Sequence, residues 1–425
     1  MRSIFGGEMK KWRVFLVVFA LVLAAPRAPA DQVFEFLHRI SNGLGLDEAT
    51  GLRTFPTLLI SMGGEAEAMG TAYTAVGRDL SFLDGNPAAS ASLVNTEAAF
   101  YHTNLIADTS MEGFAYTIRQ DDLGLGFAAK MLHVPFTHYD AYGYNIGSFR
   151  YSESVVGVNA AYNFLRGFYF SGVSIGANAK LAYRYIPDSI YPDQSAVAVM
   201  ADIGALTRFD FLKLYSARER NTAVGVTVRN VGPPVGGDPV PTMLSVGLAY
   251  SPFRPVLVAF DYNVPLSLFT DHEREMPGFA IGTRVRVTDF ITSQAGFLWR
   301  GNNPRFSLGT VIDLQPVRLA VNYTLDMTTQ LDRFDRFSVQ AGFAFGDRGR
   351  RAVEQQVEEL YLDALVAFAE GNIELTIDLA EKALELDPRF QPAAETRDTA
   401  KTMLSLQERM DTLRFDESIA PEDEL

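Results

Sequence analysis

The sequence predicts an all-β transmembrane barrel of about 14 antiparallel strands with an N-terminal plug and a small C-terminal α-helical extension. Three observations lead to this fold class. Between residues 97 and 346, segments of about ten residues place apolar side chains at every second position, with Gly, Pro, Asn or Asp between the segments. The alternate positions are rich in glycine. After residue 346 the apolar period changes to about 3.6, which indicates helices.

Residues 1–30 have the composition of an export signal. A basic stretch at 10–13 precedes the apolar run 14–25, and small residues follow at 28–30. We expect cleavage just before Asp31. The alternative is an uncleaved anchor, but a run of about a dozen apolar residues is short of the roughly 20 that a membrane-spanning helix needs.

Composition excludes several functional classes. The chain has no cysteine, so disulfides, thiolate catalysis and cysteine-ligated metals are ruled out. The net charge of -14 comes mostly from acidic residues after Arg351, while the middle of the chain is nearly neutral. Neither part has the basic character that nucleic acid binding requires, so no nucleic acid partner is expected.

The strand pattern is clearest in residues 173–185. One phase there is Val173, Ile175, Ala177, Ala179, Leu181, Tyr183 and Tyr185, and the other is Ser174, Gly176, Asn178, Lys180, Ala182 and Arg184. Similar segments begin near Ala98, Met111, Leu123, Ser152, Phe170, Gln194, Asn221, Thr242, Arg254, Met276, Phe290, Arg305, Val317 and Arg336. With an even number of strands, the start of the first strand and the end of the last strand lie on the periplasmic side. The long connections at 134–151 and 263–275 are then expected to face outward.

A soluble β-sandwich or propeller would also alternate, but its solvent-facing positions seldom carry so many glycines. The glycines are Gly124, Gly126, Gly157, Gly176, Gly225, Gly247, Gly282, Gly296, Gly309 and Gly342. Small residues facing a lumen leave room for water, a ligand or a plug. Aromatic residues near segment ends suit interfacial girdles. They are Tyr101, Tyr162, Tyr183, Tyr185, Tyr250, Tyr262, Trp299 and Tyr323.

Residues 31–96 precede the first strand and do not alternate. We expect short helices at Val33–Ile40 and Ala66–Val76. A Gly- and Ala-rich segment of this size fits inside a barrel of about fourteen strands as a plug. The alternative is a periplasmic cap.

Residues 347–414 form the predicted helical extension, which we place in the periplasm. Its spacing resembles a tetratricopeptide helix pair. The matching residues are Tyr361, Ala364, Leu365, Phe368, Gly371, Asn372, Ala380, Ala383, Leu384 and Pro388, and Thr376 departs from the usual small Ala. One such repeat buries too little to stand alone, so a third helix is expected at 392–413, or else packing on the barrel or a partner. Residues 415–425 are predicted to be disordered.

Residues 63–93 carry a family resemblance. The order is Ala68, Met69, Gly70, Ala72 and Tyr73, then Asp79 and Ser81, then Asn86, Pro87 and Ala88. This stretch resembles the plug signature of the long-chain fatty acid transporter (FadL) family, including its PorV-like and uncharacterised treponemal branches. It departs from the family pattern at Arg78 and Ala89. Independently of the family, Asn86 is suited to cap a short helix that Pro87 begins.

The resemblance implies passive uptake of a hydrophobic molecule, such as a long-chain fatty acid, past the plug of a barrel in the bacterial outer membrane. Such a ligand is held by apolar area, with one or two cations orienting its carboxylate. The candidates in the lumen phase are Lys130, Lys180, Arg184, Arg229, Arg284, Arg286 and Arg318. The alternative role for each is pairing with a carboxylate such as Asp202, Asp261 or Asp326.

Two other classes of function compete with transport. PorV-like members of the family resemble accessory factors of secretion systems, and the helical extension then serves as a docking surface for a periplasmic protein. An enzyme is the third class, but the chain has no Gly-x-Ser-x-Gly, no His-Glu-x-x-His and no phosphate loop. Its five histidines lack metal-ligand spacing, so no catalytic residue, metal or cofactor is expected.

Overall fold

The computed structural model describes residues 53–106, 108–216, 219–266, 275–301, 303–326 and 335–418. The predicted export signal at 1–30 and the predicted helix Val33–Ile40 lie outside these residues. Within them, no helix combines the length and the apolar character needed to cross a membrane.

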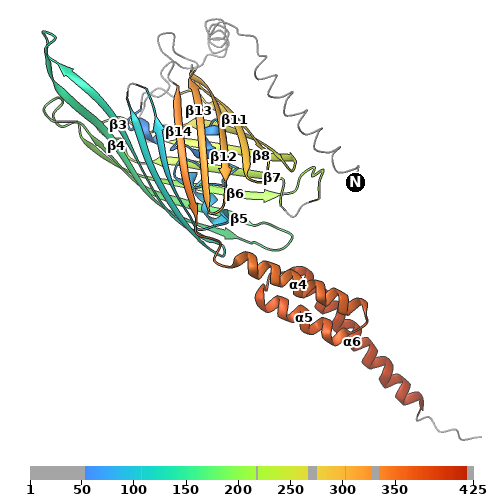
Figure 1. Cartoon of the computed structure of the whole chain (residues 1–425). Coiled ribbons are helices and arrows are strands. Elements are labelled where there is room, and N and C mark those ends of the chain that lie inside the picture. The colour runs from blue at the N-terminus through green and yellow to red at the C-terminus, as the bar shows by residue number, and fades with distance from the viewer. Residues whose placement is uncertain are drawn as a thin grey trace, which may run out of the picture. The chain divides into compact units, whose positions relative to one another are not determined.

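Fourteen antiparallel strands in the described residues close into one barrel, which confirms the predicted fold class (Figure 1). The first seven are β1 (Glu97–Asn104), β2 (Ser110–Gln120), β3 (Leu123–Tyr139), β4 (Asn145–Phe164), β5 (Val173–Tyr185), β6 (Ala196–Phe209) and β7 (Thr222–Val231). The others are β8 (Met243–Phe253), β9 (Val256–Pro265), β10 (Gly278–Arg286), β11 (Ile291–Arg300), β12 (Asn303–Asp313), β13 (Val317–Asp326) and β14 (Arg336–Ala344). Each strand pairs with its neighbours in sequence, and β1 pairs with β14 to complete the ring.

The two phases of each strand face opposite sides of the wall. In β5, Ile175 and Leu181 are exposed on the outside, while Asn178 and Lys180 on the alternate phase are buried. The same division recurs in β13, where Val321 is exposed and Asn322 is buried. The closed ring of strands pairs the backbone groups with one another, and the exterior side chains are apolar. Both features are needed for a barrel to lie in lipid.

The hairpin of β3 and β4 is longer than predicted and projects past its neighbours in Figure 1. The sequence predicted a long connection at 134–151, but only residues 140–144 separate the two strands. Pro135 lies inside β3, although proline is usually excluded from the interior of a fully paired strand. However, β2 pairs with β3 only as far as His133, so Pro135 lies where β3 has a free edge, the position at which a strand accepts proline.

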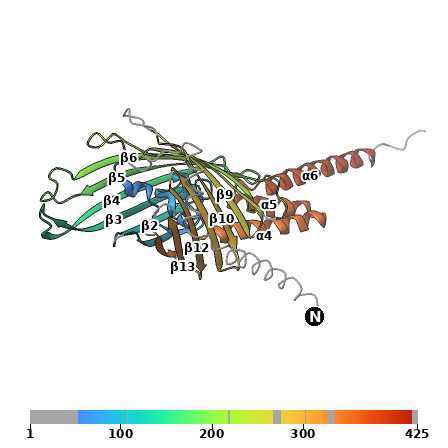
Figure 2. The same cartoon turned by 90° about the horizontal axis from the view of Figure 1, so that it is seen from above.

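Residues 53–96 form the plug, which is enclosed by the barrel wall in Figure 2. It contains η1 (Pro56–Leu59), α3 (Gly64–Ala68), η2 (Ser81–Leu83) and η3 (Pro87–Ser92). The predicted helix at 66–76 is wrong beyond Ala68. Gly70 and Thr71 adopt left-handed φ values of 61° and 67°, which end the helix and turn the chain.

Wall glycines allow the plug backbone to approach the strands directly. A Cβ at Gly176 would lie 2.5 Å from the carbonyl oxygen of Pro87, and one at Gly282 would lie 2.7 Å from that of Met69. At these glycines the backbone of residues 53–96 therefore occupies the space next to the wall. Gly342 differs, because the nearest atoms to a Cβ there belong to Arg318 of the wall, at 3.6 Å.

Two of the predicted girdle aromatics are buried instead of exposed. Tyr101 lies on the inward phase of β1 and packs with plug residues such as Met62 and Leu80. Trp299 is covered by the rings of Phe279 and Phe297, with ring centroids about 6 Å away. The sequence places aromatics along a strand, but only the plug and the neighbouring strands show which of them are covered.

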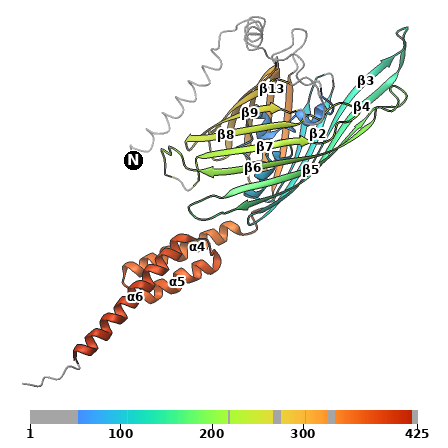
Figure 3. The ribbon, with the colours of Figure 1, turned by 180° about the vertical axis from the view of Figure 1, so that it is seen from behind.

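Three helices follow the barrel, α4 (Arg350–Ala369), α5 (Ile373–Leu386) and α6 (Gln391–Ser418), and they can be followed in Figure 3. Their shared core is built from small residues, including Ala364, Ala380 and Ala393. Thr376 is fully buried there, and its hydroxyl donates to the carbonyl of Asn372 (2.8 Å), so the buried polar group has a partner. The third helix was predicted correctly.

The prediction of disorder from residue 415 is wrong as far as Ser418, where α6 ends. The sequence 415–418 holds neither Gly nor Pro, so nothing in it interrupts a helix that is already formed. Residues 419–425 lie outside the described part.

The turn between β4 and β5 contacts the helices. The ring of Phe168 meets that of Phe390 edge to face at 5.1 Å, and Phe390 in turn meets Tyr361. Beside this cluster, the carboxylate of Asp122 accepts hydrogen bonds from Arg389 and from Arg166 of the turn. This end of the barrel, where β1 begins and β14 ends, is called the tail end below, and the opposite end is called the loop end.

Candidate functional site

Most of the lumen cations predicted as ligand contacts are paired within the protein. The Nζ of Lys130 lies 2.5 Å from the carboxylate of Asp84 in the plug. The Nζ of Lys180 lies 2.7 Å from the carboxylate of Asp202 on β6. Both lysines are almost completely buried, so they act as fixed counter-ions inside the wall rather than as groups presented to a ligand.

The arginine candidates differ from one another. Arg284 pairs with Glu65 of the plug at 3.4 Å, and Arg318 pairs with Asp313 at 3.2 Å. Arg184 donates to the Thr54 hydroxyl, and its guanidinium lies 5.5 Å from the ring centre of Phe55. Arg286 is exposed at the tail end of β10.

Arg229 alone among these candidates lines a cavity between the plug and the wall on the loop-end side. Its guanidinium donates to the carbonyl of Asp84 and to the Ser245 hydroxyl, while its buried Nε has no hydrogen-bond partner. The lining comes from plug residues 58–61, 66, 71, 73–74 and 84–85 and from β7 to β11.

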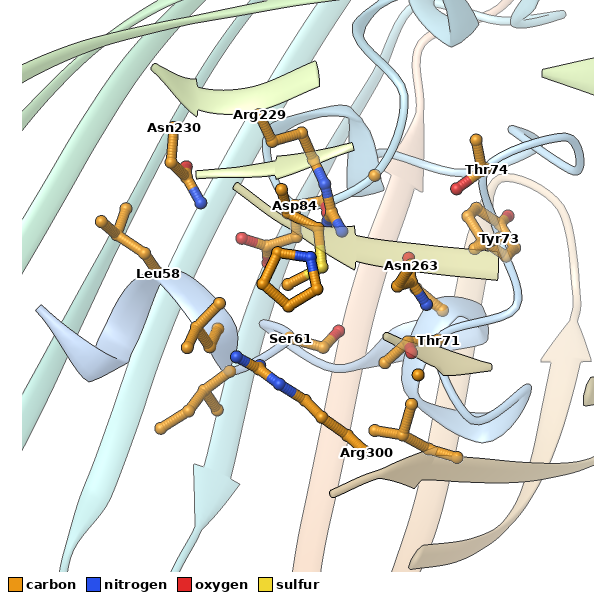
Figure 4. A pocket seen from close by; sticks show the side chains of 18 residues that line it. Leu58, Ser61, Thr71, Tyr73, Thr74, Asp84, Arg229, Asn230, Asn263 and Arg300 are labelled. Atoms are coloured by element: carbon orange, nitrogen blue, oxygen red, sulfur yellow. The ribbon is translucent and has the colours of Figure 1, made fainter. Parts of the chain in front are cut away.

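Arg300, which the sequence reasoning missed, lines the same cavity from β11. One of its terminal nitrogens lies 2.9 Å from the carboxylate of Glu275, and its buried Nε has no hydrogen-bond partner. Figure 4 shows Arg229 and Arg300 reaching toward the middle of the cavity from opposite sides. Arg300 has the same strand parity as the inward-facing Gly296, which was a signal that could have identified it.

The cavity combines apolar walls with these two cations. Leu58, Leu59, Met243 and Leu298 supply apolar surface, and Ser61 and Asn263 supply neutral polar groups. Its volume is about 80 Å³. That space holds a few water molecules or the polar end of a ligand, and a long acyl chain does not fit while the plug is seated.

The plug motif residues hold the plug together and fasten it to the wall. Asn86 caps η3 by accepting from the backbone N–H of Ala88 (3.0 Å), as predicted, and its amide donates to the carbonyls of Thr74 (3.0 Å) and Ala205 (2.9 Å). The last of these lies on β6. One side chain therefore joins two plug segments and one strand.

Two buried carboxylates organise the plug backbone. Asp79 accepts from the N–H of Ser81 (2.9 Å) and of Glu65 (3.3 Å). Asp261 of β9 accepts from the N–H groups of Tyr73 (2.9 Å) and Thr74 (2.8 Å). The sequence suggested Asp261 as a partner for an arginine, but its hydrogen-bond partners are backbone groups of the plug.

Among the remaining motif residues, Gly70 and Ala72 lie in the turn after α3, and Pro87 and Ala88 begin η3. A Cβ at Gly70 would lie 2.6 Å from the backbone nitrogen of Phe297, so glycine is required both by its φ and by the closeness of β11. Ala72 and Ala88 are fully buried. Among the described residues, no group of three or more His, Asp or Glu side chains is arranged to hold a metal ion.

A family model described as an uncharacterised protein family, UPF0164, matches residues 45–347, which include the plug and all fourteen strands. The chain belongs to this family. Its relatives include UPF0164 proteins of Treponema pallidum (strain Nichols). One is 27% identical over 385 residues, covering 87% of this chain and 88% of the relative. Another is 27% identical over 395 residues, covering 84% and 77%.

Similar solved structures include two that have low sequence identity to this chain. The toluene transporter TodX of P. putida gives a TM-score of 0.44 at 12% identity, covering 67% of this chain and 98% of that one. The outer membrane protein Omp33 of Acinetobacter baumannii gives 0.34 at 12% identity, covering 59% and 98%.

Proposed function

We propose that this protein is an outer-membrane channel that admits hydrophobic small molecules carrying an anionic group, such as long-chain fatty acids, by passive passage around or through the plug. The observation that carries the proposal is the pair Arg229 and Arg300, whose buried Nε groups lack partners at a cavity between plug and wall. The helical extension lies in the periplasm in this proposal.

A carboxylate suits this pair for electrostatic reasons. The cavity is lined by two guanidinium groups, whereas the nearby carboxylate of Glu275 is already engaged by Arg300 and by Arg53 (2.9 Å each). Guanidinium forks bind carboxylates with two parallel hydrogen bonds, which become stronger in a water-poor site. The apolar lining at Leu58 and Leu298 then contacts the first methylenes of the ligand.

The closed state of the lumen defines how passage would work. Because the cavity holds only about 80 Å³, a ligand that enters from the loop end stops at the plug. Further movement requires the plug to shift from the wall. The ligand carboxylate would compete with Asp84, whose backbone carbonyl accepts from Arg229 and whose side chain pairs with Lys130.

A matched pair of ligands tests this proposal. Oleate and oleyl alcohol share one chain, and only oleate carries a carboxylate. We expect the purified protein in mild detergent to bind oleate more tightly, and Arg229→Gln and Arg300→Gln each to weaken oleate by roughly tenfold while leaving oleyl alcohol unchanged. Arg150→Gln is the control, because Arg150 is exposed on β4 and lines none of the cavities described here. Equal binding of both ligands to all variants would refute the site.

A second candidate function is that of an accessory protein that docks a periplasmic partner through the helices. Leu362, Leu365 and Val366 on α4 support it, because their spacing puts them on one face and all three are exposed. Deleting residues 350–425 separates the two functions. If the protein is a transporter, the truncated barrel should take up oleate as the full chain does. If it is a docking protein, the truncated chain should no longer bind its partner.

A further inference from the structure

A second cavity, larger and more basic than the first, lies at the tail end of the barrel. It has a volume of about 330 Å³. Its charged lining consists of Arg78, Arg220, Arg254, Arg284, Arg286 and Glu219. These groups come from the plug, the β6–β7 connection, the β8–β9 turn and β10, so segments distant in sequence contribute five guanidinium groups to one space.

The protein balances only part of this charge. Arg220 pairs with Asp210 (2.5 Å) and Arg284 pairs with Glu65 (3.4 Å). Arg254 donates to a neutral group, the carbonyl of Ser216 (2.8 Å). Within the described part of the chain, neither Arg78 nor Arg286 has an ion-pair partner at or below 4.0 Å. Arg78, Arg254 and Arg286 therefore face the single carboxylate of Glu219, which leaves about two positive charges in excess.

A neighbouring cavity at the same end shows how the chain balances such charges when it holds both members of a pair. The charged groups that line that cavity are Arg78, Arg318, Arg351, Glu97 and Asp313, and Arg351 also lies 3.9 Å from the carboxylate of Asp347. There the guanidinium of Arg318 lies 3.2 Å from Asp313 and 3.9 Å from Glu97. Arg78 lines both cavities, so the groups that distinguish the larger cavity are Arg254 and Arg286, whose charges no carboxylate pairs with in the described residues.

We propose that this arginine cavity binds a phosphate group carrying about two negative charges, supplied either by a free phosphate compound or by the headgroup of a phosphomonoester lipid. Clustered guanidinium groups recognise phosphate oxygens through paired, charge-assisted hydrogen bonds, and the charge of a phosphomonoester matches the excess. The site is distinct from the Arg229 and Arg300 cavity and does not depend on the function proposed above.

The test uses the full-length protein in mild detergent with two phosphate probes. Inorganic phosphate and dihexanoyl phosphatidate are measured by calorimetry or native mass spectrometry, with dihexanoyl phosphatidylcholine as the lipid control. The informative variant is Arg254→Gln with Arg286→Gln, because neither side chain is in an ion pair in the described structure and the barrel should fold normally. Arg150→Gln is the matched control.

We expect binding of at least one phosphate probe, weakened by roughly tenfold or more in the double variant and unchanged in Arg150→Gln and Arg229→Gln. Binding of both probes identifies the phosphate group itself as the ligand, and binding of phosphatidate alone identifies a lipid headgroup. Binding of neither probe, or equal binding by the double variant, would overturn the proposal. Because Arg229→Gln leaves this site intact, its result is separable from the oleate experiment.

Discussion

The Nζ of Lys130 on β3 lies 2.5 Å from a carboxylate oxygen of Asp84 in the plug, and the same ammonium group donates to the carbonyl of Ile60 (2.7 Å). The pair is nearly excluded from solvent. It joins the wall to the plug beside the cavity that Arg229 lines, so the plug is held at the point where the proposed ligand would arrive.

Breaking this pair from one side should therefore destabilise the barrel. We expect Lys130→Met to lower the free energy of unfolding by about 3 kcal/mol, because it leaves the carboxylate of Asp84 buried without its partner. Lys382→Met is the control. Lys382 pairs with Asp378 at a similar distance, 2.7 Å, but both side chains are about half exposed, so its loss should cost less than about 1 kcal/mol. Urea unfolding in lipid vesicles measures both, and equal effects would contradict the plug attachment.

A side chain added at a wall glycine should displace the plug. At Gly282 a Cβ would lie 2.7 Å from the backbone oxygen of Met69, which cannot rotate away as a side chain can. We expect Gly282→Val to raise conductance in planar bilayers as the plug loses its position. Gly342→Val is the matched control, since its nearest contact is 3.6 Å. If both variants conduct like the unsubstituted protein, the plug does not depend on this close approach.

The two asparagine caps should differ in their effect on stability. Asn372 caps α5 by accepting from Leu375 at 3.2 Å on an exposed helix, and Asn372→Ala should cost about 1 kcal/mol. Asn86→Ala should cost about 2 to 3 kcal/mol, because it also removes the amide that donates to the buried carbonyls of Thr74 and Ala205. Thermal or urea unfolding of the two variants gives the comparison, and a similar cost for both would show that the bridge between plug and wall adds little.

The contact between the β4–β5 turn and the helices should weaken in acid. Burial acts to raise the pKa of Asp122, but hydrogen bonds from Arg389 and Arg166 outweigh it and hold that pKa below its ordinary value. A carboxyl whose pKa is lower in the folded state stabilises the fold above its unfolded pKa, about 3.9, and loses that contribution as the pH falls through its folded pKa. The contact should therefore be intact at neutral pH, begin to weaken below about pH 4, and be lost as the pH falls through the lower pKa of folded Asp122.

Because the native chain has no cysteine, spin labels can be placed at two chosen sites. Leu165→Cys in the turn and Glu385→Cys on α5 report the distance across the contact. We expect a narrow distance distribution at pH 7 that broadens below pH 4, and Arg389→Gln should broaden it already at pH 7. A distribution that stays narrow in acid would show that the Phe168 and Phe390 rings hold the contact without the ion pairs.

Much of the barrel could be predicted because its physical rule is local. A strand between lipid and a packed lumen must alternate apolar side chains with polar or small ones. The position of a residue such as Ile175 or Asn178 in this alternation therefore predicts which side of the wall it faces. Predictions failed where a distant neighbour decides the outcome. The long β3–β4 hairpin accommodates Pro135 only because β2 stops pairing at His133, and the helix at residue 66 ends early because β11 lies against Gly70.

The sequence by itself determined the strand number, the apolar exterior, the glycine-rich interior and the cap at Asn86, since each follows from alternation or from a few adjacent residues. Only the tertiary structure decided which lumen cations are already paired. Lys130, Lys180 and Arg318 have carboxylate partners on the plug or on the wall. By contrast, the buried Nε of Arg229 and that of Arg300 have no hydrogen-bond partner in the described residues. Charge pairing acts through space across a closed ring of strands, and a one-dimensional pattern does not contain those distances.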